Sequence, residues 1–202
     1  MVYSKTEKTI AKQQARRRKI IRAAIEIFSD NNPGNTSIKA IAQKAGIATG
    51  TLYLYFADKE ALMDTVVKEM YTELLSIIKK ERSRHIDVFD KLQASMEVCI
   101  QTFMKEKRFA KILLKYYPEI NSPINTKFTD IENDLIRFVK EDLDELQKQQ
   151  LIPLQDTQVS ATAFVGTFRQ VVLSWIDHEE PSDLEQAYRT LIDYNLRGLG
   201  KR

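Results

Sequence analysis

The fold is decided by the stretch AGIATGTLYLYF, residues 45–56. Its second half is rich in aromatic residues and alternates roughly as a half-buried strand does. A strand would need a partner to satisfy its backbone groups, and the sequence offers no second strand within reach. As a helix, the same stretch places Leu52 and Phe56 at positions i and i+4, where both pack on a core. We therefore predict a short helix with Tyr53 and Tyr55 turned away from that core.

The segments on both sides of this stretch are also predicted to be helical. A helix capped by Thr36 or Ser37 is expected to end at Gly46, and the short helix follows from about Thr49. Asp58 has the position of a cap for a long helix that reaches about residue 82. Two short helices joined by a tight turn that contains glycine form a helix-turn-helix arrangement.

The rest of the chain predicts helices only. Its 6 Gly and 5 Pro are sparse, and most of them fall where a helix is expected to end. Ser182 and Glu185 have the spacing of a capping box, which marks the start of the last helix. Further helices are expected over residues 12–30, 86–105, 108–117, 122–149, 156–178 and 182–199. The fold class is thus all-α with about nine helices, divided into a helix-turn-helix domain, residues 1–58, and a larger domain, residues 59–202.

The composition argues against secretion, membrane insertion, metal binding and catalysis. Cys99 is the only cysteine, so no internal disulfide forms, and His85 and His178 do not complete a set of zinc ligands. Neither histidine nor Cys99 has an evident catalytic partner, so we expect no enzyme, no metal and no cofactor. The N-terminus lacks a signal peptide and charges interrupt the apolar runs, which predicts a cytoplasmic protein with no membrane segment.

Positive charge is concentrated at the N-terminal end. Residues 1–60 hold 11 Lys or Arg against 5 Asp or Glu, whereas the remaining residues hold 20 against 23. Eight cations fall within the first 22 residues, beside one acid, Glu7. Taken alone, such a run is also compatible with a solvated tail on a helix. Next to a helix-turn-helix pattern, the same run of cations is expected to supply the salt-sensitive part of the affinity for DNA.

The short helix carries residue types that suit the major groove of DNA. Its first residues, Thr49, Gly50 and Thr51, are small enough for the helix end to approach base edges. Hydroxyl groups of Thr and Tyr donate to phosphate oxygens, and Lys59 adds a charged contact. The alternatives are ordinary ones, because both tyrosines could pack on the next helix and Lys59 could be a plain surface lysine.

These residues stand in a recognisable order. The pattern consists of Ile41-Ala42, Ala45-Gly46-Ile47, Gly50-Thr51-Leu52-Tyr53, Tyr55-Phe56 and Lys59-Glu60-Ala61-Leu62. It resembles the N-terminal region of the TetR/AcrR family of bacterial transcriptional regulators over about residues 15–65. The resemblance implies a dimeric repressor in which the first three helices bind a palindromic operator and a larger C-terminal domain binds an inducer.

The resemblance assigns the DNA contacts residue by residue, with Leu52 and Phe56 as structural residues. The predicted contacts are Thr36, Ser37, Thr49, Gly50, Thr51, Tyr53, Tyr55 and Lys59, joined by Arg16 and Arg17 from the basic arm. Two departures from the family pattern affect the turns. Pro33-Gly34-Asn35 stands where the family has Gly followed by an aromatic residue, and Ala48 replaces a frequent serine.

The larger domain is expected to bind a largely apolar effector and a second copy of the chain. Apolar faces of the middle helices, on which no charge cluster intrudes, suggest a pocket lined by Met96, Cys99, Phe103, Leu113, Tyr117, Phe128, Ile131, Leu135 and Phe164. Each of these residues could equally be ordinary core. The last two helices are expected to form the homodimer interface through Phe168, Val171, Trp175, Leu184, Tyr188 and Leu191. Arg169 and Gln170 could serve either region. The alternative is a bundle that mediates protein contacts and binds no effector.

Overall fold

The computed structural model describes residues 7–30, 36–115 and 123–201 of the 202-residue chain. Of residues 7, 115 and 123–131 it describes the backbone alone. The expectations for Pro33-Gly34-Asn35, for the helix end at residues 116–117 and for a cap at Ser122 therefore lie outside the described residues. The remaining expectations are compared with the structure below.

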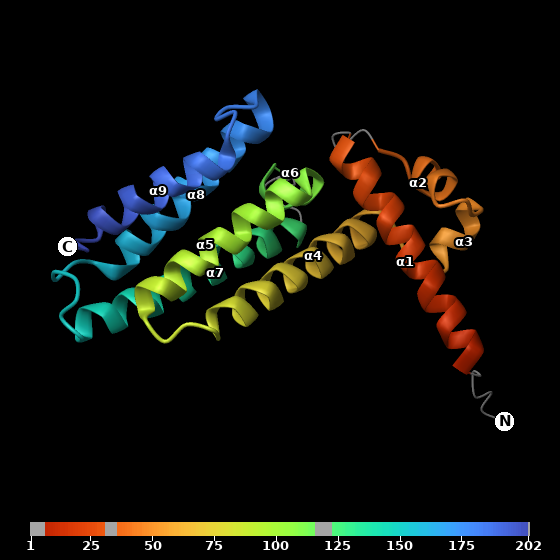
Figure 1. Cartoon of the computed structure of the whole chain (residues 1–202). Coiled ribbons are helices and arrows are strands. Elements are labelled where there is room, and N and C mark those ends of the chain that lie inside the picture. Colours follow the sequence, from red (N-terminus) through yellow and green to blue (C-terminus); the bar gives the residue numbers. More distant parts are fainter. Residues whose placement is uncertain (1–6, 31–35, 116–122, 202) are drawn as a thin grey trace. The chain divides into compact units, whose positions relative to one another are not determined.

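The described residues form nine helices, as the sequence predicted, and the fold is all-α (Figure 1). The helices are α1 (Glu7–Asp30), α2 (Ile38–Lys44), α3 (Thr49–Tyr53), α4 (Lys59–Arg82), α5 (Val88–Lys105), α6 (Lys107–Lys115), α7 (Pro123–Lys148), α8 (Thr157–His178) and α9 (Leu184–Gly198). Two predicted starts are corrected. Helix α1 begins at Glu7 rather than near Lys12, because its exposed first turns contain good helix formers and need no apolar periodicity. The cap of α9 is Asp183, whose carboxylate accepts a 2.9 Å hydrogen bond from the Gln186 N–H, rather than Ser182.

The chain forms two compact units, Met1–Glu69 and Met70–Arg202, which divide inside α4. The predicted division at residues 58 and 59 coincides with the start of α4 and stays a prediction about function. The first turns of α4 belong to the first unit because Leu62, Met63 and Val66 are buried there. Helix α4 is continuous, so a single helix contributes to both units.

The first unit has a core of side chains from α1, α2, α3 and the start of α4. Within it, α1 packs on α2, and α2 packs on α3 (Figure 1). The core consists of Ile20, Ile21, Ala24, Phe28, Ile41, Ala42, Ala45, Leu52, Phe56, Leu62, Met63 and Val66. Burial of these apolar residues on successive turns of α1 and on both short helices holds α2 and α3 in place.

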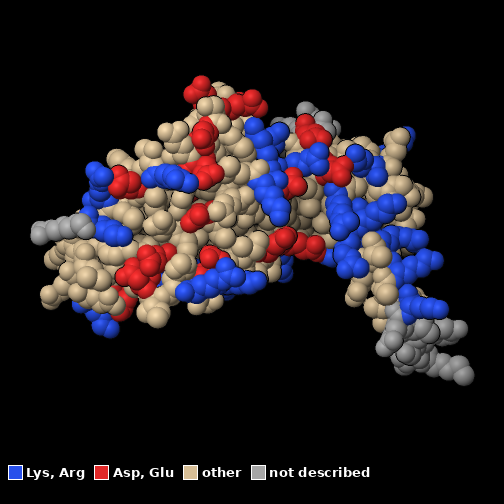
Figure 2. All heavy atoms as spheres, in the orientation of Figure 1, with Lys and Arg blue, Asp and Glu red and all other residues tan. Residues whose placement is uncertain are grey.

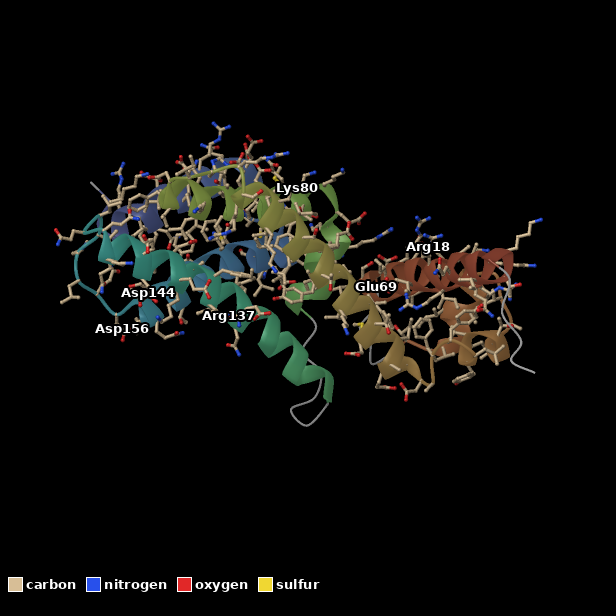
Figure 3. All side chains as sticks on the ribbon, turned by 90° about the horizontal axis from the view of Figure 1, so that it is seen from below. Arg18, Glu69, Lys80, Arg137, Asp144 and Asp156 are labelled. Carbon is tan, nitrogen blue, oxygen red and sulfur yellow. The ribbon has the colours of Figure 1, made fainter. Side chains whose placement is uncertain are left out.

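The second unit is a bundle in which α7 packs on α8, α8 on α9, and α9 on α5. Helix α6 is short and packs on both α5 and α8. Hydrogen bonds fasten the connection between α7 and α8, since the Thr157 hydroxyl donates to Asp144 at 2.6 Å and Asp156 caps α8 through the amides of Gln158 and Val159. Figure 3 shows Asp144 and Asp156 close together at this connection.

Helix α8 departs from one expectation. The sequence suggested that charges interrupt every apolar run, but α8 holds Arg169 alone over 18 residues and is the one helix, among those described, that is long and apolar enough to cross a membrane. A core helix meets the same criteria of length and composition. In this chain α8 packs on α6, α7 and α9, yet only 33% of its most apolar window is buried. Helix α8 therefore has a face that its own chain does not cover.

Candidate nucleic-acid interface and effector region

The turn between α2 and α3 depends on one glycine. Gly46 has a φ of +62°, in the left-handed region that favours glycine, and the Ile47 N–H donates to the Ala42 carbonyl at 3.0 Å. At the other end of α2, the Ser37 hydroxyl oxygen accepts a 3.1 Å hydrogen bond from the Ala40 N–H. These two contacts set the length of α2 and the direction in which the chain enters α3.

Helix α3 divides its residues between the core and solvent. Leu52 is fully buried and Phe56 is 5% exposed, whereas Tyr53 is 52% exposed. Tyr55 follows the end of α3 and is half-buried, so the two predicted tyrosines are not equivalent. Leu54, which the sequence did not single out, is 83% exposed. The outward surface of this segment is therefore made by Tyr53 and Leu54, with Tyr55 beside them.

The start of α3 is slim and uncrowded. Gly50 is exposed, and a Cβ atom added to it would meet nothing within 4 Å. Thr49 and Thr51 on either side are half-buried. Ala48 occupies the cap position and makes no side-chain cap bond, which is the consequence expected where a serine is absent. The backbone of this helix end can therefore be approached closely from outside.

Three of the remaining predicted contacts, Thr36, Ser37 and Lys59, differ in how far they are exposed to solvent. Thr36 is 8% exposed, so its hydroxyl is buried, and Ser37 is the residue of that pair that reaches the surface. The prediction for Thr36 is corrected for this reason. Lys59 is half-buried at the start of α4, where the Asp58 carboxylate accepts a 2.7 Å hydrogen bond from the Ala61 N–H.

The basic residues of α1 have separate roles. The Arg17 guanidinium forms an ion pair with Glu69 and lies 5.7 Å from the centre of the Phe56 ring, so it is engaged inside the unit. This pairing argues against Arg17 as a phosphate contact, whereas Arg16 is exposed. Arg18, labelled in Figure 3, is likewise exposed. Figure 2 shows Lys and Arg side chains crowded over the first unit, with few acids between them.

Two further exposed polar residues lie on α2. Lys39 and Gln43 are one helical turn apart, opposite the buried Ile41 and Ala42. The sequence contained this signal, because the positions between the apolar residues of an amphipathic helix face outward. Both residues therefore extend the polar surface that begins at Ser37.

In the second unit, part of the predicted effector region is core. Met96, Cys99 and Phe103 on α5, Leu113 on α6 and Phe164 on α8 are all buried, whereas Leu135 on α7 is half-buried. Tyr117 and the side chains of Phe128 and Ile131 lie outside the described residues. Burial raises the pKa of the Cys99 thiol to about 12, so the thiol is neutral at physiological pH and behaves as an apolar residue.

Charge intrudes on the middle helices, contrary to expectation. Arg82 near the end of α4 donates to both Asp142 carboxylate oxygens, at 2.6 and 2.7 Å, and to the Ser95 hydroxyl oxygen at 3.0 Å. Asp142 is 7% exposed, and its burial raises the pKa of the carboxyl group while the Arg82 contact opposes that rise. Periodicity did not reveal this pair because its partners lie 60 residues apart in sequence.

The described residues also form two open grooves along α5. One, of about 540 Å³, includes Glu81, Arg84, Asp90 and Glu97, and the other, of about 410 Å³, includes Glu97, Lys105, Glu185 and Arg189. Both grooves are lined by acids and cations together. No group of three or more metal-ligating side chains occurs in the described part of the chain.

The predicted dimer residues divide into two sets. Phe168, Leu184 and Tyr188 are buried in their own chain, and the Phe168 ring lies 5.4 Å from Phe164 and 6.3 Å from Tyr188, so these residues are corrected to core. Val171, Trp175 and Leu191 are half-buried. The outward stripe of α8 consists instead of the exposed Val159, Ala163 and Gln170 with the half-buried Gly166 and Ser174, and on α9 Tyr194 is 68% exposed.

Known proteins share both the sequence pattern of the first unit and the fold of the chain. Residues 20–66 match the family described as bacterial regulatory proteins, tetR family. The chain is 21% identical to the fatty acid metabolism regulator protein of Bacillus subtilis (strain 168), over 89% of this chain and 93% of that protein. It shares its fold with the fatty acid degradation regulator FadR from Bacillus halodurans, with a TM-score of 0.80, 22% identity, and coverage of 90% of this chain and 98% of that one. The fold also matches a transcriptional regulator FadR from Bacillus subtilis in complex with stearoyl-CoA, with a TM-score of 0.81, 21% identity, and coverage of 89% and 97%.

Proposed function

Because this chain is a DNA-binding transcriptional regulator of the TetR family and not an enzyme, we propose that it acts as a ligand-responsive repressor. It binds a palindromic operator as a homodimer and releases it when a long-chain acyl thioester occupies the larger unit. The effector class is suggested by the stearoyl-CoA bound to the Bacillus subtilis relative of the same fold. The apolar side chains of α5, α6 and α8 suit the acyl chain of such a ligand.

The observation that carries the DNA-binding part of this proposal is the open end of α3. Leu52 is buried, Tyr53 is exposed, and Gly50 has empty space beside it, so the helix end can enter a major groove while its back stays in the core. Hydroxyl groups of Ser37 and Tyr53 then donate to phosphates, and Thr49 and Thr51 approach base edges. The exposed cations of α1 add the salt-dependent part of the affinity.

Dimerisation uses the outward stripe of α8 together with α9. In this proposal two copies pack these helices as a four-helix interface, and the interface fixes the separation of the two α3 helices. For a palindrome read on one face of B-DNA, that separation is about 34 to 36 Å or a multiple of it. Helix α4 continues from the DNA-binding unit into the larger unit, so a ligand that moves its second half changes the position of α3. Effector and operator would oppose each other with a coupling of roughly 1 to 3 kcal/mol.

A single substitution tests the DNA-binding surface. Gly50→Leu adds a bulky side chain where the chain itself leaves room, so the protein should fold normally while its α3 no longer fits the groove. Operator fragments are first selected from a random DNA pool with the wild-type protein, and binding is measured by fluorescence anisotropy. We expect at least about a hundredfold loss of affinity, the scale of one or two base contacts.

Gln149→Leu, a change at an exposed residue just after the end of α7, serves as the control and should bind DNA as the wild type does. If Gly50→Leu binds the operator as tightly as the wild type, α3 does not contact the DNA. Recovery of fragments without two-fold symmetry would contradict the dimeric reading. Titration of the complex with stearoyl-CoA tests the effector, and release of the fragment is the expected result.

A further inference from the structure

Helix α6 has a charge pattern unlike that of the other helices of its unit. The segment Lys107–Lys115 carries Lys107, Arg108, Lys111 and Lys115 and has no acid. On two other helices of the unit, α7 and α9, four cations have acidic partners about one turn away, in the pairs Arg137–Asp134, Lys140–Asp144, Arg189–Glu185 and Arg197–Asp193. Such pairs neutralise a solvated face, and α6 has no residue with which to form one. An excess of like charge on so short a helix points to an anion from outside.

The two faces of α6 are sharply divided. Phe109, Ala110, Ile112 and Leu113 are buried against α5 and α8, in the region of the predicted effector pocket. Arg108 is exposed and Lys111 is half-buried, so the cations lie on the solvent side. Figure 2 shows blue side chains gathered over the corner between α5 and α6. One short helix therefore separates an apolar interior from a cationic surface.

Both ends of α6 are fixed to α8 by cations that already have partners. The Lys107 ammonium lies 4.7 Å from the centre of the Trp175 ring and 3.4 Å from a Glu179 carboxylate oxygen. Near the other end, Arg169 of α8 donates to the Leu114 carbonyl at 3.4 Å. In contrast, Arg108, Lys111 and the adjoining Lys105 have no acidic partner among the described residues. These three side chains remain available to an anion, and the helix that carries two of them is held in place.

We propose that Arg108 and Lys111, with Lys105 beside them, bind the phosphate groups of the coenzyme A part of the effector. This inference rests on the proposed function and makes it more specific. Coenzyme A carries a pyrophosphate and a 3′-phosphate, and a flexible arm separates them from the thioester. The arm is long enough to pass one helix, so the acyl chain enters the apolar side of α6 while the phosphates stay on its cationic side. Phosphate oxygens suit Arg and Lys well, since both donors form charge-assisted hydrogen bonds.

The geometry makes a distinction between two related ligands. Free stearate has the acyl chain but a single carboxylate, whereas stearoyl-CoA adds phosphates that reach the α6 surface. The protein should therefore prefer the thioester, and the preference should depend on Arg108 and Lys111. Because these contacts are exposed, salt should reduce the preference, as the screening length falls from about 10 Å at 0.1 M to about 3 Å at 1 M.

The test uses the full-length protein and two probes, stearoyl-CoA and stearate. Binding is measured by calorimetric titration of the wild type and of the double variant Arg108→Gln, Lys111→Gln. The control variant, Lys148→Gln, removes a cation from the exposed end of α7. We expect the double variant to bind stearoyl-CoA at least about tenfold more weakly, the scale of one charged hydrogen bond, with unchanged affinity for stearate. The control should match the wild type with both probes.

Three results would overturn the proposal. Equal loss of affinity for both probes would mean that the substitutions disturb the acyl pocket. A double variant that binds stearoyl-CoA as tightly as the wild type would show that Arg108 and Lys111 do not bind the phosphates. The proposed function would not be affected by that result. A wild type that binds neither probe would refute the acyl thioester as effector, and the α6 proposal with it. In that case operator binding by the wild type, measured separately, would still support the DNA-binding part.

Discussion

Two glycines near the turn between α2 and α3 illustrate how single residues divide structure from function. Gly46 is required by the backbone, since its φ of +62° is a conformation that other residues adopt at a cost. Gly50 lies in a helix with open space beside it, so neither its conformation nor its packing demands glycine. The absence of a side chain at Gly50 is therefore explained by what approaches from outside, which fits a DNA-reading helix end.

This difference predicts opposite responses to the same substitution. Gly46→Ala should lower the free energy of unfolding by about 1 to 2 kcal/mol, because alanine is forced into the left-handed region. A Cβ at this position would also lie 3.3 Å from the Lys19 ammonium, which must shift slightly. Gly50→Ala should leave stability unchanged or raise it by up to about 1 kcal/mol, because alanine is the better helix former. Urea denaturation measures both, and equal destabilisation by the two changes would contradict this account.

At the scale of elements, the second half of α4 is fastened by polar contacts. Tyr71 donates to Asp134 of α7 at 2.8 Å, and Arg82 binds Asp142 of the same helix three turns further along α4. The Arg82 and Asp142 side chains are 18% and 9% exposed, so both ions are largely removed from water. A buried pair contributes little net stability over an apolar replacement, but the loss of one partner leaves an uncompensated charge. The pair therefore acts mainly to fix how α4 lies on α7.

A double-mutant cycle tests this role. Asp142→Leu should lower the free energy of unfolding by about 3 kcal/mol, because Arg82 then stays buried without a counter-ion, and Arg82→Met should likewise lower it because Asp142 is left without its partner. The double variant Arg82→Met, Asp142→Leu should recover much of that loss. In addition, it should weaken the response of operator binding to stearoyl-CoA, since α4 and α7 would no longer move together. Additive effects of the two single changes in urea denaturation would show that the residues are not coupled.

For the whole molecule, the decisive surface is the uncovered side of α8. Val159, Ala163, Gly166 and Gln170 recur every three or four residues and form a stripe of mostly small side chains, in which Gly166 is half-buried and the other three are exposed. Small residues allow two helices to approach closely, and the apolar character of α8 is otherwise hard to reconcile with solvent on that side. A second copy of the chain is the partner we propose for this surface.

Gly166→Arg tests the proposed dimer without disturbing the single chain. A Cβ at Gly166 meets nothing within 4 Å, so the arginine extends into solvent in a monomer but into the partner in a dimer. We expect sedimentation velocity to show a shift from dimer to monomer at micromolar concentration, accompanied by loss of operator binding. Gln149→Arg adds the same charge away from the stripe and should remain dimeric. If Gly166→Arg remains a dimer, this face of α8 is not the dimer interface.

The sequence was most informative where local rules decide the structure. Periodicity and caps predicted the helices around Leu52 and Phe56, because the i, i+4 spacing and the residues at helix ends act within a few residues. The same rules failed for Thr36, which looked like a surface cap but is buried. They also did not decide which face of α8 its own chain covers, and Phe168, which was expected at the dimer interface, is buried.

By itself, the sequence determined that the chain is all-helical, that residues 49–53 form a helix with Tyr53 outward, and that its N-terminal region resembles the TetR family. Only the tertiary structure decided that Arg17 pairs with Glu69, 52 residues away, and that Arg82 pairs with Asp142, 60 residues away. It also decided which side of α8 is left uncovered. The physical reason is that helix formation and capping act locally, whereas burial and ion pairing depend on which distant helices share a surface.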